Sequence, residues 1–137
     1  MIKIKYNMDL MKYMSLFETL TQAKLKDCLM SEKVLFIVEE GQMGKAIGKG
    51  GINVRKLENV FKKKVRIVEF SSDVAQFVKN LTYPLNVREV KKEDNIVVIG
   101  ADDTSTRSLI IGRDRRNLNE MISIVKRFYD IENIKVV

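Results

Sequence analysis

A glycine-rich segment, Ala46-Ile47-Gly48-Lys49-Gly50-Gly51-Ile52-Asn53, has the residue types needed to hold a phosphate group. Inside a helix each glycine costs about 1 kcal/mol relative to alanine, so this segment predicts a tight turn. Because glycines have no Cβ atom, the N–H groups of such a turn can approach an anion closely, and the following helix points its N-terminus at the same place. The predicted chemistry is anion binding by the backbone, with Lys49 as the charge at the tip.

Side chains that support catalysis or bind metals are scarce. The chain has no histidine and one cysteine, Cys28, so neither a histidine-activated nucleophile nor an ordinary Cys/His zinc site is expected. The carboxylate pair Glu39-Glu40 precedes a helix start, where acidic side chains favour the helix dipole. The glycine spacing matches neither a Walker A loop nor a dinucleotide-binding fingerprint. We therefore expect no enzymatic activity, cofactor, metal ion or small-molecule substrate.

The charge of the chain favours a polyanionic partner. Lys and Arg number 25 and Asp and Glu number 18, which gives a formal net charge of +7 and a pI near 9.5. Nucleic acid is the first candidate and an anionic membrane the second, and the plain alternative is a basic protein kept soluble by its charge. The apolar run Val34 to Val38 is too short to span a bilayer, and the N-terminus lacks the apolar core of a signal peptide. We therefore expect a cytoplasmic protein without a membrane partner.

The elements that must position the glycine turn follow from the spacing of apolar residues. Alternation of Ile2, Ile4 and Tyr6 predicts a short strand or an extended arm. Helical spacing then predicts a helix to about residue 21, followed by strands at 24–30 and 34–38. A short helix leads into the glycines, and a helix to residue 61 and a strand at 64–70 follow them. In the 24–30 strand, alternation places Leu25, Asp27 and Leu29 on one side.

The same order of elements returns in the second half. Ser71-Ser72-Asp73 caps a helix that ends before Pro84, and strands are predicted at 85–92 and 96–99. A short helix, a second turn, a long helix and a closing strand at 133–137 complete the series. The chain is therefore an internal repeat. Adding 64 to a position carries Ile47 to Ile111, Gly48 to Gly112, Lys49 to Arg113 and Asn53 to Asn117.

These features resemble a known family. A helix and a strand placed before strand–helix–loop–helix–strand, with Ile-Gly-x-x-Gly as the loop, are similar to the prokaryotic, or type II, KH domain. Two such domains with almost no linker resemble the archaeal NusA-like transcription termination/antitermination factors. The most specific segments are Met43 to Gly51 and Ile111 to Leu118. The resemblance implies an α+β fold (an α/β sandwich) of two domains, 1–70 and 71–137, each a three-stranded sheet packed by helices.

The resemblance also implies a function. It indicates a non-catalytic factor that binds single-stranded RNA during transcription termination or antitermination, with RNA polymerase or its elongation complex as the context. Bacterial relatives add a polymerase-contacting domain and an S1 domain, for which 137 residues leave no room, so direct polymerase contact stays open. Two alternatives also stay open: a protein-interaction module that reuses the KH fold, and a ribosome-associated RNA-binding protein.

The residues that the resemblance assigns to RNA lie in the two loops and in the helical turn after each. Gly48, Gly50 and Gly51 let the backbone close in on a phosphate, and the lysine between them supplies charge. The full set expected to contact RNA is Ile47, Gly48, Lys49, Gly50, Gly51, Arg55, Lys56, Gly112, Arg113, Arg115 and Arg116. The nearby run Lys62-Lys63-Lys64 is interpreted as a solvated helix end.

The second loop departs from the pattern, because Arg115 replaces its last glycine and Asp114 precedes it. A Cβ atom at residue 115 restricts positive φ, and Asp114 repels phosphate. Against this, Arg107, Arg113, Arg115 and Arg116 supply guanidinium groups that can each bind phosphate through two hydrogen bonds. The second domain either binds RNA through arginines or only scaffolds the first, and we expect weaker participation rather than none.

Overall fold

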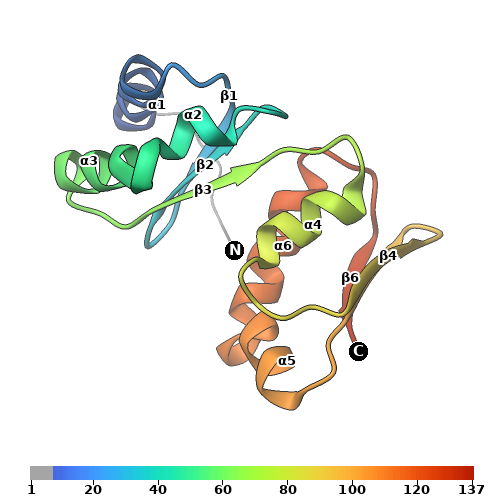
Figure 1. Cartoon of the computed structure of the whole chain (residues 1–137). Helices are drawn as coiled ribbons and strands as arrows, with labels where there is room; N and C mark the ends of the chain where they lie inside the picture. The colour runs from blue at the N-terminus through green and yellow to red at the C-terminus, as the bar shows by residue number, and fades with distance from the viewer. Residues whose placement is uncertain (1–7) are drawn as a thin grey trace. The chain divides into compact units, whose positions relative to one another are not determined.

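The computed structural model describes residues 8–137 (Figure 1). The strand or arm expected at Ile2, Ile4 and Tyr6 lies outside the described residues. The chain separates into two compact units, one ending at Ser71 and the other running from Ser72 to Val137. Each unit contains a three-stranded sheet packed by helices, which confirms the predicted α+β fold class.

The first unit places the glycine turn on a crossover between parallel strands. Its elements are α1 (Met8–Thr21), β1 (Leu25–Met30), β2 (Val34–Val38), α2 (Met43–Ile47), the 3-10 turn η1 (Lys49–Gly51), α3 (Ile52–Phe61) and β3 (Val65–Glu69). The sheet order is β1-β2-β3, with β1 antiparallel and β3 parallel to β2. A parallel pair needs a connection that crosses one face of the sheet, and α2, the turn and α3 make that connection here.

The core of the first unit anchors both helices that flank the turn. Phe36 of β2 stacks on Phe17 of α1 with ring centroids 4.2 Å apart, and the Phe61 ring of α3 lies 6.0 Å from that of Phe36. Ala46 of α2 and Leu57 of α3 are fully buried in the same cluster. Each large apolar side chain buried in this way contributes about 1.5–3 kcal/mol. The turn is therefore held between two helices that pack into one hydrophobic core.

A β-bulge breaks the alternation predicted for β1. Leu25 pairs with Val38, whereas Asp27 pairs with Ile37, so the register shifts between them. Leu25 packs against the helix-covered core, but Asp27 and Leu29 are buried outside that cluster. The prediction that Leu25, Asp27 and Leu29 share one side is wrong, because one extra residue in a strand reverses the facing of those beyond it.

The second unit repeats this topology. Its elements are α4 (Val74–Thr82), β4 (Glu89–Glu93), β5 (Ile96–Gly100), α5 (Thr104–Ile111), the 3-10 turn η2 (Arg113–Arg115), α6 (Arg116–Lys126) and β6 (Asn133–Val136). β4 is antiparallel and β6 parallel to the central β5. β4 begins later than the predicted residue 85, because the N–H groups of Leu85 and Val87 donate to Thr82 and Leu85 in local turns (2.9 and 3.0 Å).

Two helices of the second unit are capped at their N-termini by aspartates. Asp73 accepts a hydrogen bond from the N–H of Ala75 at the start of α4, and Asp103 accepts one from Thr106 at the start of α5. The hydrogen bonds from Thr106 hold the pKa of Asp103 below its ordinary value. This cap therefore contributes its full stability at pH values above the ordinary carboxyl pKa. It loses that stability as the pH falls through the lowered pKa of Asp103. Helix α5, which leads into the second loop, is fixed at its start in this way.

Candidate nucleic-acid interface

The first loop, Gly48–Gly51, has a backbone conformation that depends on glycine. Gly48 has φ 77° and ψ 168°, a region that residues with side chains essentially never enter. Gly50 and Gly51 follow in the left-handed region, with φ of 64° and 75°. The N–H of Gly51 donates to the carbonyl of Gly48 (3.1 Å) and closes the turn. The tight turn predicted from the glycines is present where it was expected.

The tip of this loop presents backbone donors to solvent. Lys49 and Gly50 are exposed, and neither of their N–H groups donates to another group in the described part of the chain. Successive N–H groups in such a turn form a concave site for an anion. The Lys49 ammonium lies at the same tip, so the loop combines fixed backbone donors with one mobile positive charge.

The second loop, Gly112–Arg115, has the same backbone shape with fewer glycines. At the three positions where the first loop has glycine, φ is 76°, 56° and 61° in the second loop, at Gly112, Asp114 and Arg115. The N–H of Arg115 closes this turn on the carbonyl of Gly112 (3.2 Å). The Cβ atom at residue 115 thus does not prevent the left-handed conformation, although such a residue costs roughly 1–2 kcal/mol there.

An asparagine to which the sequence assigned no role braces each loop. The side-chain amide of Asn53 donates to the carbonyl of Lys45, and that of Asn117 donates to the carbonyl of Leu109, both at 2.9 Å. Each bond ties the first turn of the second helix to the last turn of the first. A Cβ atom on Gly48 would lie 2.9 Å from the Asn53 side chain, so that glycine also makes room for the brace. The 64-residue repeat, which pairs the two asparagines, is the signal that could have revealed this.

We expect Asn53→Ala and Asn117→Ala each to lower the free energy of unfolding by about 1 kcal/mol, because each removes one hydrogen bond. The angle between the two helices is then less restrained as well. Urea denaturation followed by circular dichroism measures the first effect. Asn119→Ala is the matched control, because Asn119 is exposed two residues further along α6, and it should change stability by less than about 0.5 kcal/mol.

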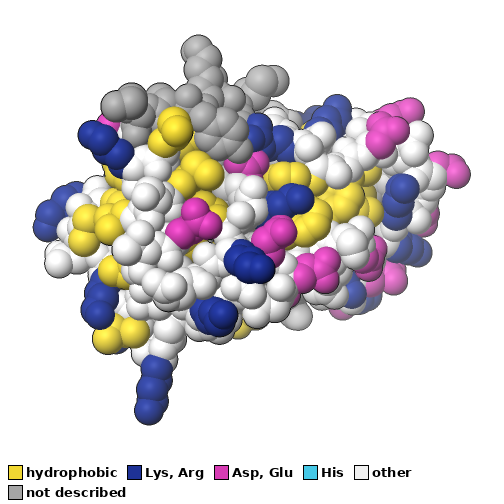
Figure 2. Space-filling model, turned by 90° about the horizontal axis from the view of Figure 1, so that it is seen from above, with side chains coloured by type: hydrophobic (Ala, Val, Ile, Leu, Met, Phe, Trp, Pro, Cys, Tyr) yellow, Lys and Arg dark blue, Asp and Glu magenta, His cyan; other side chains and the backbone are white. Residues whose placement is uncertain are grey.

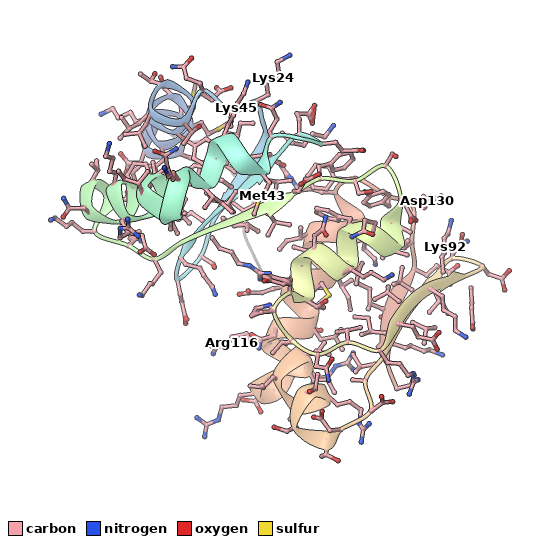
Figure 3. All side chains as sticks on the ribbon, viewed as in Figure 1. Lys24, Met43, Lys45, Lys92, Arg116 and Asp130 are labelled. Atoms are coloured by element: carbon pink, nitrogen blue, oxygen red, sulfur yellow. The ribbon has the colours of Figure 1, made fainter. Side chains whose placement is uncertain are left out.

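The cations predicted downstream of the first loop take different positions. The Arg55 guanidinium donates to the carbonyl of Gly50 (2.7 Å), so it lies against the loop and holds its tip. Lys56 is exposed on α3, one turn from the loop. Figure 3 shows Lys45 and Met43 leaving α2 on different sides, with Met43 packed against the core. Ile47 is half-buried beside that core.

The arginines predicted to act at the second loop also take different positions. Arg113, Arg115 and Arg116 are exposed in the loop and at the start of α6, and Figure 3 labels Arg116. Arg107 instead donates to the carbonyl of Ala101 (2.7 Å) and to the hydroxyl of Thr104 (3.1 Å). Its guanidinium is therefore engaged at the start of α5 and not at the loop.

Surface charge does not mark an interface on the face of the molecule that Figure 2 shows. Figure 2 shows one face of the molecule, on which Lys and Arg side chains are scattered among acidic and hydrophobic ones and form no continuous patch. The loops are distinguished by their backbone geometry and by the exposed cations that they carry.

The described residues contain no arrangement suited to catalysis by a thiol or a metal. Burial, together with the negative charge of Asp27, raises the pKa of the Cys28 thiol to about 12, so it stays protonated at neutral pH. Within residues 8–137 there is no group of three or more Asp, Glu, Cys or His side chains that could hold a metal ion. None of the helices that the structure describes is long and apolar enough to cross a membrane.

Comparison with known proteins agrees with this architecture. A KH-domain family model matches residues 12–95. The "Probable transcription termination protein NusA" of Methanococcus vannielii is 37% identical over 140 residues, which cover 99% of this chain and 81% of that protein. The protein of the same name from Methanocaldococcus jannaschii is 33% identical over 141 residues, covering 100% and 77%. The crystal structure of APE1850 shares the fold, with a TM-score of 0.73 at 24% identity over 96% of this chain and 100% of that one.

This chain therefore belongs to the KH-domain family. The relatives that match it over nearly its whole length are archaeal NusA proteins, so the predicted resemblance to the archaeal NusA-like group is confirmed.

Proposed function

We propose that the protein is a non-catalytic factor that binds single-stranded RNA during transcription termination or antitermination. Residues 1–70 act as a KH domain with an intact glycine loop and residues 71–137 as one with a degenerate loop. The observation that carries the proposal is the first loop, where two N–H groups without a partner among the described residues lie beside Lys49, between helices that pack into one core. The family membership and the names of the relatives support the transcriptional context.

The proposed mechanism divides the work between backbone and side chains. Phosphate oxygens accept hydrogen bonds from the N–H groups at the loop tip, while the Lys49 ammonium neutralises their charge. Arg55 holds the tip from behind through the Gly50 carbonyl (2.7 Å), and the exposed Lys56 meets the next phosphates. The bases, of which about four are held in this mode, are read at edges that only unpaired RNA exposes.

In the second unit, phosphate is bound by the three exposed arginines of the loop rather than by close approach of the backbone. They bind phosphate through paired N–H donors, and Asp114 at the tip opposes them by repulsion. The second loop therefore contributes less affinity than the first. The partners are single-stranded RNA and, in the cytoplasm, the transcribing RNA polymerase or its elongation complex.

The affinity for an unstructured RNA, measured as a function of salt, tests this proposal. If about four to six phosphates are neutralised, log K should fall against log salt with a slope of about −0.7 for each of them. Fluorescence anisotropy with a labelled oligonucleotide gives this slope. Absence of binding at low salt would contradict RNA binding. Co-sedimentation with small ribosomal subunits, and not with transcribing polymerase, would contradict the transcriptional role.

A further inference from the structure

Two lysine-bearing turns meet at one end of the first sheet. The N–H of Val34 donates to the carbonyl of Lys64 (2.9 Å), and Val34 pairs with Val65 in the parallel register of β2 and β3. Lys33 and Lys64 immediately precede these paired residues, so they lie side by side although 31 positions apart (64 minus 33). Together with Lys62 and Lys63 they form what we call the lysine corner.

A solvated helix end explains only part of this cluster. Lys62 fits that explanation, because it caps α3 in the left-handed conformation (φ 56°) and its ammonium reaches the Asn59 side chain at 3.4 Å. Lys33 comes from the turn between β1 and β2, so the dipole of α3 does not account for it. Like charges that are brought close together repel even in water, and binding of a polyanion relieves that repulsion.

The carboxylates at the corner do not cancel its charge. Glu58 directs one oxygen to the N–H of Val65 (3.0 Å), which fixes it against the backbone at the start of β3. Glu32 lies in the same turn as Lys33. Among the residues that the structure describes, two carboxylates therefore stand against four ammonium groups, of which those of Lys33, Lys62 and Lys64 belong to exposed residues.

Helix α3 connects the corner with the glycine loop. The helix has ten residues and is thus about 15 Å long, with the loop at its start and the corner at its end. Ile52, Lys56 and Val60 recur every four residues and therefore share one face. Ile52 and Val60 are 41% and 56% exposed, so this face is open along its length. A strand held at the loop and laid along α3 reaches the corner.

We propose that the lysine corner is a second phosphate-binding surface for the same RNA strand. It extends the footprint beyond the roughly four nucleotides held by the glycine loop. This inference rests on the proposed RNA-binding function and adds the length of the bound strand to it. Lysines bind phosphate as point charges, without reading bases, so the corner contributes affinity and not sequence preference.

The test compares a short and a long RNA on the full chain. The variant is Lys33→Gln with Lys64→Gln, which leaves the helix-capping Lys62 and the half-buried Lys63 in place. The matched control is Lys12→Gln with Lys24→Gln, which removes the same charge from exposed residues in α1 and just before β1. Oligouridylates of about four and about twelve nucleotides are the probes, and the shorter one matches the roughly four nucleotides that a KH loop holds.

We expect the Lys33/Lys64 variant to bind the long RNA about tenfold more weakly, with a salt slope shallower by about 1.4 because two phosphate contacts are lost. Its affinity for the short RNA should match that of the unchanged protein, as should both affinities of the control. An equal loss on the short RNA, or in the control, would overturn the proposal. Unchanged affinity for the long RNA would also overturn it and leave an acidic protein surface as the partner of the corner. If the unchanged protein binds neither RNA, the proposed function itself fails.

Discussion

Replacing Lys49 and Gly50 together by aspartate is expected to weaken RNA binding by at least about a hundredfold. One ammonium is lost and two carboxylates are placed where the phosphate must sit, so an attractive charge-assisted contact becomes a repulsive one. The fold should survive, because a Cβ atom at Gly50 meets nothing within 4 Å. Asp114 already occupies the corresponding position of the second loop, with φ 56°.

The second loop offers a matched comparison for this experiment. Arg113→Asp gives that loop the same pair of consecutive aspartates, since Asp114 follows it. We expect a smaller loss of affinity, about tenfold, measured by the same fluorescence anisotropy titration. A loss equal to that of the first-loop variant would show that the two loops contribute alike. No loss would show that the second unit only scaffolds the first, and full binding by the Lys49/Gly50 variant would refute the role of the first loop.

Gly48→Ala is expected to be the most destabilising single change in the first loop, by about 2–4 kcal/mol. The backbone at Gly48 (φ 77°, ψ 168°) is open essentially to glycine alone. In addition, a new Cβ atom would lie 2.9 Å from the Asn53 side chain and displace its brace to Lys45. RNA affinity should fall together with stability, because the same turn shapes the anion site.

Gly44→Ala is the control for that change. Gly44 lies in α2 without a positive φ, and a Cβ atom there meets nothing within 4 Å. Alanine should therefore stabilise the helix by up to about 1 kcal/mol. Urea denaturation monitored by circular dichroism compares the two variants. Equal effects of both would mean that the conformation of Gly48 is not the constraint.

The spacing of apolar residues was sufficient to predict the order of elements in both units. Each helix and strand presents one face to a core, as Phe17, Phe36 and Leu57 do, and this leaves a periodic pattern in the chain. The bulge in β1 and the late start of β4 could not be predicted in this way. They depend on pairing with a neighbouring strand and on local turns after Thr82, neither of which leaves a periodic pattern.

The part of the candidate site that glycines form could be predicted from the sequence. The turn at Gly48 follows from residue type alone, because few other residues tolerate its backbone. The roles of Asn53 and Arg55 did not follow, since each side chain bonds a carbonyl that is close only after the chain has folded. Residue propensities alone also do not predict the left-handed turn of the second loop, where tertiary packing holds Arg115 in a conformation that its residue type disfavours.

The two loops show that the shape of the tip and its chemistry can vary independently. In the second loop, the flanking helices hold the turn in its conformation. Its tip can therefore carry Asp114 and Arg115 in place of glycines, with φ of 56° and 61°. Of the two repeated units, one has the glycine backbone of the clamp and the other carries different charges on the same scaffold. Two units with the same frame can therefore differ in the ligands that they favour, and a search for glycine spacing alone overlooks the second unit.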